Sequence, residues 1–98
     1  MQPDHFHPDI WFLPGRGPRY EQLHRHLLQL IEAEVLPSDI QLPPERELAE
    51  LAQVSRVTVR KAVAQLVADG VLEQRRGAGT FVRSHKARSE PYVSKLLS

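Results

Sequence analysis

Residues 42–83 decide the fold, and they read LPPERELAELAQVSRVTVRKAVAQLVADGVLEQRRGAGTFVR. The stretch holds two helical patterns separated by a tight break, and a glycine-rich hairpin follows them. Hydroxyl and cationic side chains crowd the first two turns of the second helix, at residues 55–61. A short helix, a tight turn and a second helix with such an N-terminal face are typical of a helix-turn-helix. We therefore predict a mainly α domain with a small β-hairpin, that is, a three-helix winged helix-turn-helix.

The second helix of this stretch is predicted over residues 55–69 and carries a signal at each end. Ser55 is a strong N-cap, because its hydroxyl can accept a backbone N–H of the following turn. Gly70 is the left-handed residue that ends the helix, and Val71 can then close back on Leu66. The apolar residues at helical spacing form an inward face, and they are Val59, Ala62, Val63 and Leu66.

The remaining elements follow from the same kinds of pattern. An apolar stripe that begins at Tyr20 predicts a helix over residues 18–35, and a second stripe predicts a helix over residues 44–52. Two short strands are expected within residues 71–83. They flank the sequence RGAG at residues 76–79, whose glycines allow the positive φ angles of a hairpin tip.

Two tails flank the predicted domain. Residues 1–17 contain three prolines and two glycines without helical periodicity, which predicts a flexible N-terminal arm. Within this arm, residues 10–13 are too apolar for a solvated tail, so they dock either on the domain or on a second subunit. Residues 84–98 are polar and basic and then weakly apolar, which predicts a linker toward a further domain.

Length and composition exclude several classes of protein. The 98 residues suffice for one small domain with tails, and the absence of cysteine excludes a disulfide framework or a thiolate zinc site. No apolar run approaches the roughly 18 residues of a transmembrane helix. The N-terminus lacks the cationic start and the apolar stretch of a signal peptide. These features predict a cytoplasmic protein with no membrane partner.

The net charge of +1 hides an asymmetry between the two halves of the chain. Residues 1–53 hold four Lys/Arg against nine Asp/Glu, a net charge of −5, whereas residues 54–98 hold nine against three, a net charge of +6. The cations therefore gather with the second helix and the hairpin, as expected for a protein that binds a polyanion. A basic face that is merely solvated would give the same charge, so the charge alone leaves both interpretations open.

Four ordered sequence blocks resemble the DNA-binding domain of the GntR family of bacterial transcription regulators. They are YEQL at residues 20–23, LPPERELA at 42–49, VSRVTVRKA at 54–62 and GAGTFV at 77–82. The resemblance covers about residues 18–83, and the tail at residues 90–98 is similar to the linker of HutC-like members. It implies a metabolite-responsive repressor that binds double-stranded operator DNA at a palindromic site as a homodimer. The effector would bind a domain that this chain does not contain.

The resemblance also implies which residues read the bases. Arg56 and Arg60 are the candidates for guanine O6 and N7, because a guanidinium fork matches those two acceptors and an ammonium group does not. Val57 is the candidate for a thymine methyl group. Seven further residues are expected to hold the duplex. Those that face phosphates are Arg46, Ser55, Thr58 and Lys61. Those that place the wing beside or inside the minor groove, where cations gain from its negative potential, are Arg75, Arg76 and Gly77.

Three departures from the family pattern lie outside these DNA-contacting positions. Pro44 replaces the capping serine of the second helix, which removes the reciprocal bond with Glu47 at a cost of ~1 kcal/mol. Ala33 and Ser38 stand where glycines are usual in the loop before that helix, so we expect this loop to take another conformation. Gln53 replaces the glycine of the helix-turn-helix turn, and it must either adopt an unusual φ or reshape the turn.

Neither an active site nor a metal site is predicted. Five histidines are present, and none has a second ligand at i+4 on one helix face, so all are interpreted as solvated residues: His5, His7, His24, His26 and His85. No nucleophile, base and orienting group can be assembled, so we predict no enzyme and no cofactor. The alternative function is a winged helix that serves as a protein-interaction module. The residues that favour DNA instead are the cations of the third helix and the hairpin, which are Arg56, Arg60, Arg75 and Arg76.

Overall fold

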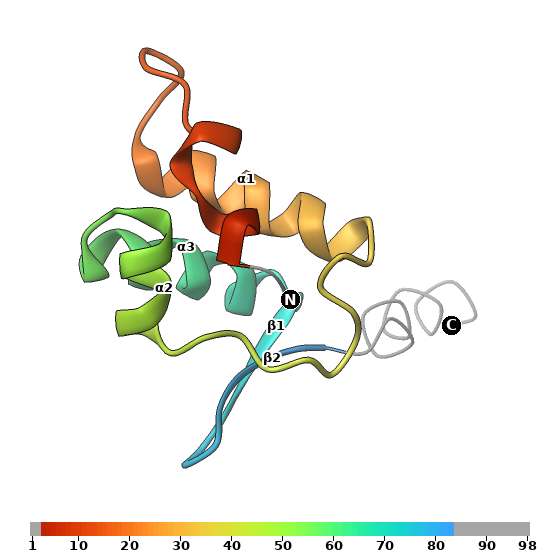
Figure 1. Cartoon of the computed structure of the whole chain (residues 1–98). Coiled ribbons are helices and arrows are strands. Elements are labelled where there is room, and N and C mark those ends of the chain that lie inside the picture. Colours follow the sequence, from red (N-terminus) through yellow and green to blue (C-terminus); the bar gives the residue numbers. More distant parts are fainter. Residues whose placement is uncertain (1–2, 84–98) are drawn as a thin grey trace.

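The computed structural model describes residues 3–83 and confirms the predicted fold class (Figure 1). Two 3-10 turns, three α-helices and one antiparallel hairpin follow one another along the chain. Their bounds are η1 Pro3–Phe6, η2 Pro8–Ile10, α1 Arg19–Glu32, α2 Glu45–Ala52, α3 Arg56–Ala68, β1 Leu72–Arg75 and β2 Gly79–Val82. The predicted linker, residues 84–98, lies outside the described residues. None of the helices in the described part of the chain has the length and apolar character that a bilayer crossing requires.

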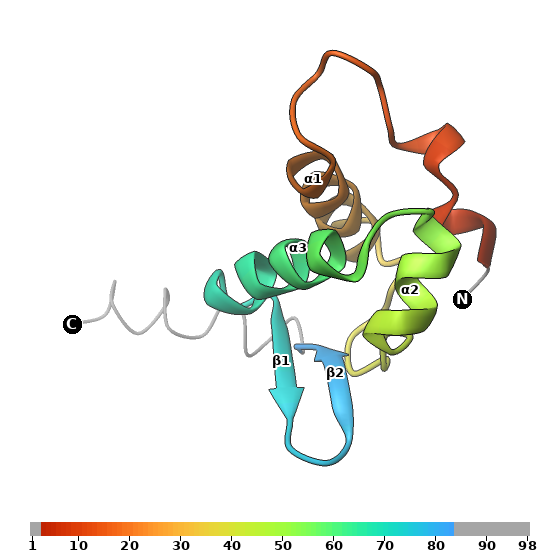
Figure 2. The same cartoon turned by 90° about the vertical axis from the view of Figure 1, so that its left-hand side faces the viewer.

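The third helix, α3, is the element against which the other two helices pack. Figure 2 shows α1 and α2 on two sides of α3, with the hairpin projecting from the helical body. Each helix buries one apolar stripe, because residues three and four apart lie on the same face. The buried apolar residues of the three helices are Leu23, Leu27, Ile31, Leu48, Ala49, Ala52, Val59, Ala62 and Leu66. The opposite face of α3 remains at the surface.

The ends of α3 take the conformations that the sequence predicts. The Ser55 hydroxyl accepts the backbone N–H of Thr58 at 3.1 Å, which caps the first turn. At the other end Gly70 has a φ of 80°, and the Val71 N–H donates to the Leu66 carbonyl at 2.9 Å. This is the closing bond of a Schellman motif. Both ends are therefore fixed by local chemistry.

The hairpin, which we call the wing, is supported by a third chain segment. Leu72 pairs with Val82 and Arg75 with Gly79 across the two strands. The loop before α2 then runs antiparallel along the outer edge of β2. Its backbone bonds to β2 are Asp39 N–H to Val82 O at 2.8 Å, Val82 N–H to Ile40 O at 2.9 Å and Leu42 N–H to Thr80 O at 2.9 Å. The wing is therefore anchored to the domain by its second strand.

The prediction of a flexible arm over residues 1–17 is wrong where this segment packs on the domain, between Phe6 and Leu13. Phe6 is fully buried and Trp11 is 8% exposed, and both belong to the core of the domain. The Trp11 indole N–H donates to the Phe6 carbonyl at 2.9 Å. The buried Gln22 side chain of α1 bonds both the N–H and the carbonyl of Leu13, at 2.8 and 3.0 Å. Burial of two large aromatic rings offsets the chain entropy that proline and glycine content alone would suggest.

The loop around α2 contains three left-handed residues that are not glycine. They are Glu34, Asp39 and Gln53, with φ angles of 60°, 68° and 54°. The resemblance to the family pattern assigned the usual glycine positions of this loop to Ala33 and Ser38. The left-handed residues are instead the next ones along the chain, Glu34 and Asp39. For Gln53, the first of the two predicted outcomes is the observed one. A side chain with a β-carbon is strained in this region, so each of these positions carries a local cost.

Candidate nucleic-acid interface

The first two turns of α3 present a cationic face to solvent. Arg56, Val57 and Arg60 are exposed, and Val57 keeps 55% of its surface accessible. Ser55 sits at the tip of this face, with its hydroxyl 2.9 Å from the Thr58 hydroxyl. All the residues predicted to read bases therefore lie together, away from the core.

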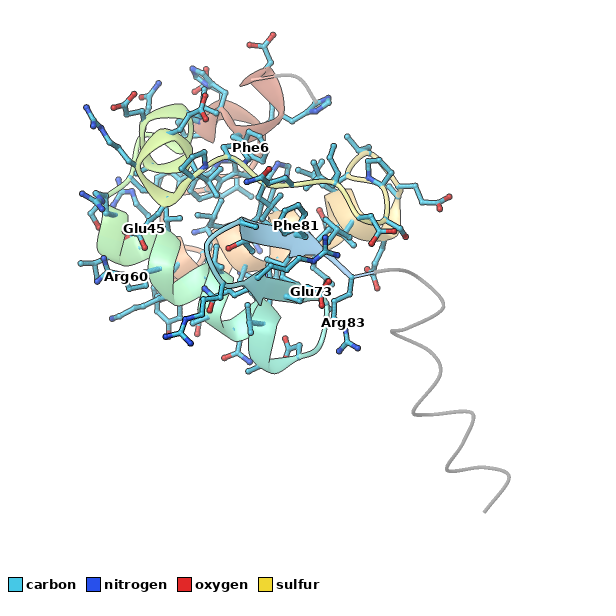
Figure 3. The ribbon with its side chains drawn as sticks, turned by 90° about the horizontal axis from the view of Figure 1, so that it is seen from below. Phe6, Glu45, Arg60, Glu73, Phe81 and Arg83 are labelled. Atoms are coloured by element: carbon cyan, nitrogen blue, oxygen red, sulfur yellow. The ribbon has the colours of Figure 1, made fainter. Side chains whose placement is uncertain are left out.

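A single carboxylate holds both of the predicted base-reading arginines. Glu45 is the first residue of α2, and its side chain lies beside Arg60 (Figure 3). Arg60 donates from Nε to Glu45 Oε2 at 3.0 Å and from Nη2 to Oε1 at 2.9 Å, which is a bidentate pair. Arg56 donates from Nε to the same Oε1 at 3.2 Å. We call these three residues the Glu45 triad.

The ion pair shifts the pKa of both Glu45 and Arg60 in the direction that favours their charged forms. Hydrogen bonding from Arg60 holds the pKa of Glu45 below its ordinary value of 4.5, and Arg56 acts in the same direction. The same hydrogen bond raises the pKa of Arg60. Sequence reasoning missed this role of Glu45. The two partners are 15 residues apart, so no local spacing signals their contact.

A cleft of about 170 Å³ lies between α2, α3 and the wing. Its walls include Glu45 and Arg60 on the helical side and Gln74 and Thr80 on the wing side. A ligand that contacts both α3 and the wing would therefore lie across this cleft.

The two arginines of the wing are in different states. Arg75 donates to Glu73 at 2.6 Å and to Asp39 at 3.5 Å, and its guanidinium lies 4.2 Å from the centre of the Phe81 ring. The hydrogen bond with Glu73 is the main cause of its raised pKa. Arg76, at the tip, is exposed and has no hydrogen-bonding or charged partner within residues 3–83. Both arginines are predicted to meet the minor groove. Within residues 3–83, only the Arg76 side chain is free of an ion pair and can turn to DNA without breaking one.

The tip of the wing is held by a side chain from the loop before α2. The Gln41 amide donates to the Ala78 carbonyl at 2.7 Å, and Gln41 also forms an isolated bridge with Phe81. A β-carbon at Gly79 would lie 2.6 Å from Gln41 Nε2, and this glycine has a φ of 124°. Gly77, with a φ of 75°, has open space around it. Gln41 thus fixes where the tip sits, a role that sequence reasoning missed.

The residues predicted to face phosphates lie on the rim of this surface. The Arg46 side chain is 80% exposed, and its one ionic contact within residues 3–83 is a long one, 3.8 Å, with Glu50 one turn later. Lys61 is exposed, and its ammonium lies 5.4 Å from the centre of the Tyr20 ring. Both cations are held by longer contacts than the arginines of the Glu45 triad.

The interpretation of the histidines as solvated side chains needs correction for three of them. The Nδ1 atom of His5 is buried. His24 Nε2 lies 3.2 Å from the Asp69 carboxylate, and His26 Nε2 lies 2.6 Å from the His5 carbonyl. His26 also stacks on the Trp11 ring at 6.5 Å. These contacts tie α1 to its neighbours. Across the described part of the chain, no group of three or more potential metal ligands occurs.

Comparison with known protein families identifies the family to which this domain belongs. The family model described as bacterial regulatory proteins, gntR family, matches residues 19–82, which is the span from the start of α1 to the end of β2. The chain belongs to the gntR family. The relatives that carry this domain are transcriptional regulators, and they include a probable fructoselysine utilization operon transcriptional repressor of Escherichia coli. That repressor is 44% identical over 70 residues, which is 71% of this chain and 29% of the repressor.

Other relatives are similar in sequence or in structure. The transcriptional repressor NagR of Bacillus subtilis is 44% identical over 70% of this chain and 28% of its own length. The DNA-binding domain of AraR in complex with operator ORX1 is 38% identical, with a TM-score of 0.64, over 67% of this chain and 80% of that one. YtrA of Sulfolobus acidocaldarius is 30% identical, with a TM-score of 0.68, over 87% and 93%. The chain spans less than a third of the length of the two curated repressors, the fructoselysine operon repressor and NagR.

Proposed function

We propose that this chain is the DNA-binding part of a bacterial transcription regulator and that it binds double-stranded operator DNA with sequence specificity. The observation that carries the proposal is the exposed arginine pair at the start of α3, across a cleft from the wing. The operator complexes of the related AraR domain support operator DNA as the ligand.

Each part of the surface has a chemically distinct role in this proposal. Arg56 and Arg60 read guanine edges in the major groove, and Val57 contacts a thymine methyl group. The wing meets the minor groove through Arg76 and Gly77, whereas Arg75 chiefly braces the strand through Glu73, Asp39 and Phe81. Phosphate contacts come from the rim residues, which are Arg46, Ser55, Thr58 and Lys61.

The intact regulator acts as a repressor in the cytoplasm, without enzymatic activity. Two chains bind as a homodimer, and each reads one half-site of a palindromic operator. A small-molecule effector binds a domain outside this chain, which follows residues 84–98 as in HutC-like members. The repressor names among the relatives, and the small share of their length that this chain spans, support this arrangement.

The experiment is a selection of preferred sites from a random duplex library, followed by titration of each variant against the selected and a scrambled duplex. Arg60→Ala should lose about 1–3 kcal/mol on the selected duplex and relax the preference at one base pair. Lys61→Ala, the adjacent cation, is the matched control. It should weaken both duplexes alike and lower the salt slope by about one unit. A chain that selects no sequence would instead indicate a protein-interaction module.

A further inference from the structure

We infer that Glu45 is a specificity-determining residue, whose carboxylate aims the guanidinium groups of Arg56 and Arg60 at base edges and withholds them from phosphates. The inference rests on the proposed function, because it concerns how this surface reads DNA. Glu45 itself need not touch DNA, so it is a positioning residue.

The bidentate pair leaves the reading end of Arg60 free. An arginine side chain carries five N–H donors. The contacts with Glu45 at 3.0 and 2.9 Å use the Nε N–H and one N–H of Nη2. The Nη1 group and the second N–H of Nη2 remain, and they form the end of the fork that matches guanine O6 and N7. The ion pair is therefore compatible with base reading and fixes the direction in which the fork points.

Glu45 has the least exposed side chain of the triad, and we infer that it is the most rigid of the three. Its side chain is 29% exposed, against 62% for Arg56 and 64% for Arg60. One turn later, Leu48 and Ala49 bury α2 in the core, so the position of the carboxylate is set by helix packing. Two long side chains are thereby ordered before DNA arrives, which reduces the entropy lost on binding.

The same carboxylate opposes binding to the wrong DNA. On a duplex without the matching guanines, Arg56 and Arg60 would gain by turning to phosphates. To do so they must leave Glu45, whose unpaired negative charge would then face a polyanion. The penalty falls only on the non-specific complex, so it raises the ratio of specific to non-specific affinity.

Glu47 offers a matched control in the same turn of α2. It carries the same charge two residues further along, it is exposed, and its side chain has no hydrogen-bonding or charged partner within residues 3–83. Glu47→Gln therefore removes one negative charge from the same helix without releasing an arginine. Glu45→Asp supplies the complementary control, since it keeps the charge but withdraws the carboxylate by one methylene group.

The test titrates four versions of the 98-residue chain, wild type and the Glu45→Gln, Glu45→Asp and Glu47→Gln variants. Each is measured on a duplex selected by the wild type and on a scrambled duplex, at several salt concentrations. Glu45→Gln should lose about tenfold in affinity for the selected duplex and gain on the scrambled one. Its salt slope should steepen by about one to two units, as the freed arginines move to phosphates. Glu45→Asp should lose on the selected duplex without that gain.

The outcomes separate the inference from the proposed function. If the wild type selects no sequence, the proposed function fails and takes this inference with it. If the wild type selects a site and Glu45→Gln keeps the same affinity ratio and salt slope, only the inference is overturned. An equal effect of Glu47→Gln would overturn it as well, because general charge would then explain the result. A thermal unfolding curve for each variant checks that all four chains are folded.

Discussion

Replacing Phe6 by alanine should destabilise the domain far more than its place near the N-terminus suggests. The ring is 0% exposed and lies among the core residues contributed by the helices. Truncating a buried phenylalanine costs about 3–5 kcal/mol, from lost transfer free energy and the cavity that remains. Domains of this size are stable by only about 5–15 kcal/mol in total. The substitution should therefore remove a large share of the free energy of unfolding.

The loss cannot exceed the free energy with which the N-terminal segment docks on the domain. Phe6 and Trp11 anchor one continuous segment, joined by the indole bond at 2.9 Å. If that segment undocks as a unit, no substitution in it can cost more than its whole docking free energy. Phe6→Ala and Trp11→Ala should then be sub-additive, with the double variant close to the worse single one. Additive losses would mean that the two rings bind independently.

Urea and thermal unfolding followed by circular dichroism measure this prediction. A loss of about 3 kcal/mol corresponds to about 12–24 °C in Tm for a domain of this length. The control is Ile10→Ala in the same segment, where the side chain is 56% exposed and the expected loss is under about 0.5 kcal/mol. A loss below about 1 kcal/mol for Phe6→Ala would refute the reasoning and restore a mobile arm.

Three further predictions concern the loops and the ion pairs. Gly79→Ala should destabilise the domain by about 1–3 kcal/mol, because the residue has a φ of 124° and a β-carbon would lie 2.6 Å from Gln41 Nε2; thermal unfolding measures it. Gln53→Gly should raise stability by about 0.5–1 kcal/mol by relieving the left-handed φ of 54°, and an unchanged or lower Tm would contradict this. Since the folded-state pKa of Glu45 is lowered, its stabilisation is present above pH 4.5 and is lost as the pH falls below it. The Tm difference between wild type and Glu45→Gln should accordingly be largest near pH 7 and shrink as the pH falls below 4.5, and a constant difference would argue against the ion pair.

The sequence by itself determined the elements whose cause is local. Ser55 and Gly70 fix the two ends of α3, because an N-cap hydroxyl and a left-handed glycine act on the neighbouring turn alone. Helical spacing gave the buried stripes, and the glycines of residues 76–79 gave the hairpin. The four sequence blocks within residues 20–82 carried the resemblance to the family. Helical spacing placed Arg56 and Arg60 together on one face, since positions four apart are neighbours on a helix.

Only the tertiary structure decided which of these groups meet partners from elsewhere in the chain. Glu45 reaches Arg60 across 15 residues and Gln41 reaches the wing tip across 37, and both contacts depend on how the elements pack. Phe6 is buried because its 3-10 turn packs against α2 and its ring joins the apolar core, which no pattern within the first residues reports. Sequence periodicity describes the environment of a residue along its own element. The contacts that tune this surface are made between elements, so they follow from the packing alone.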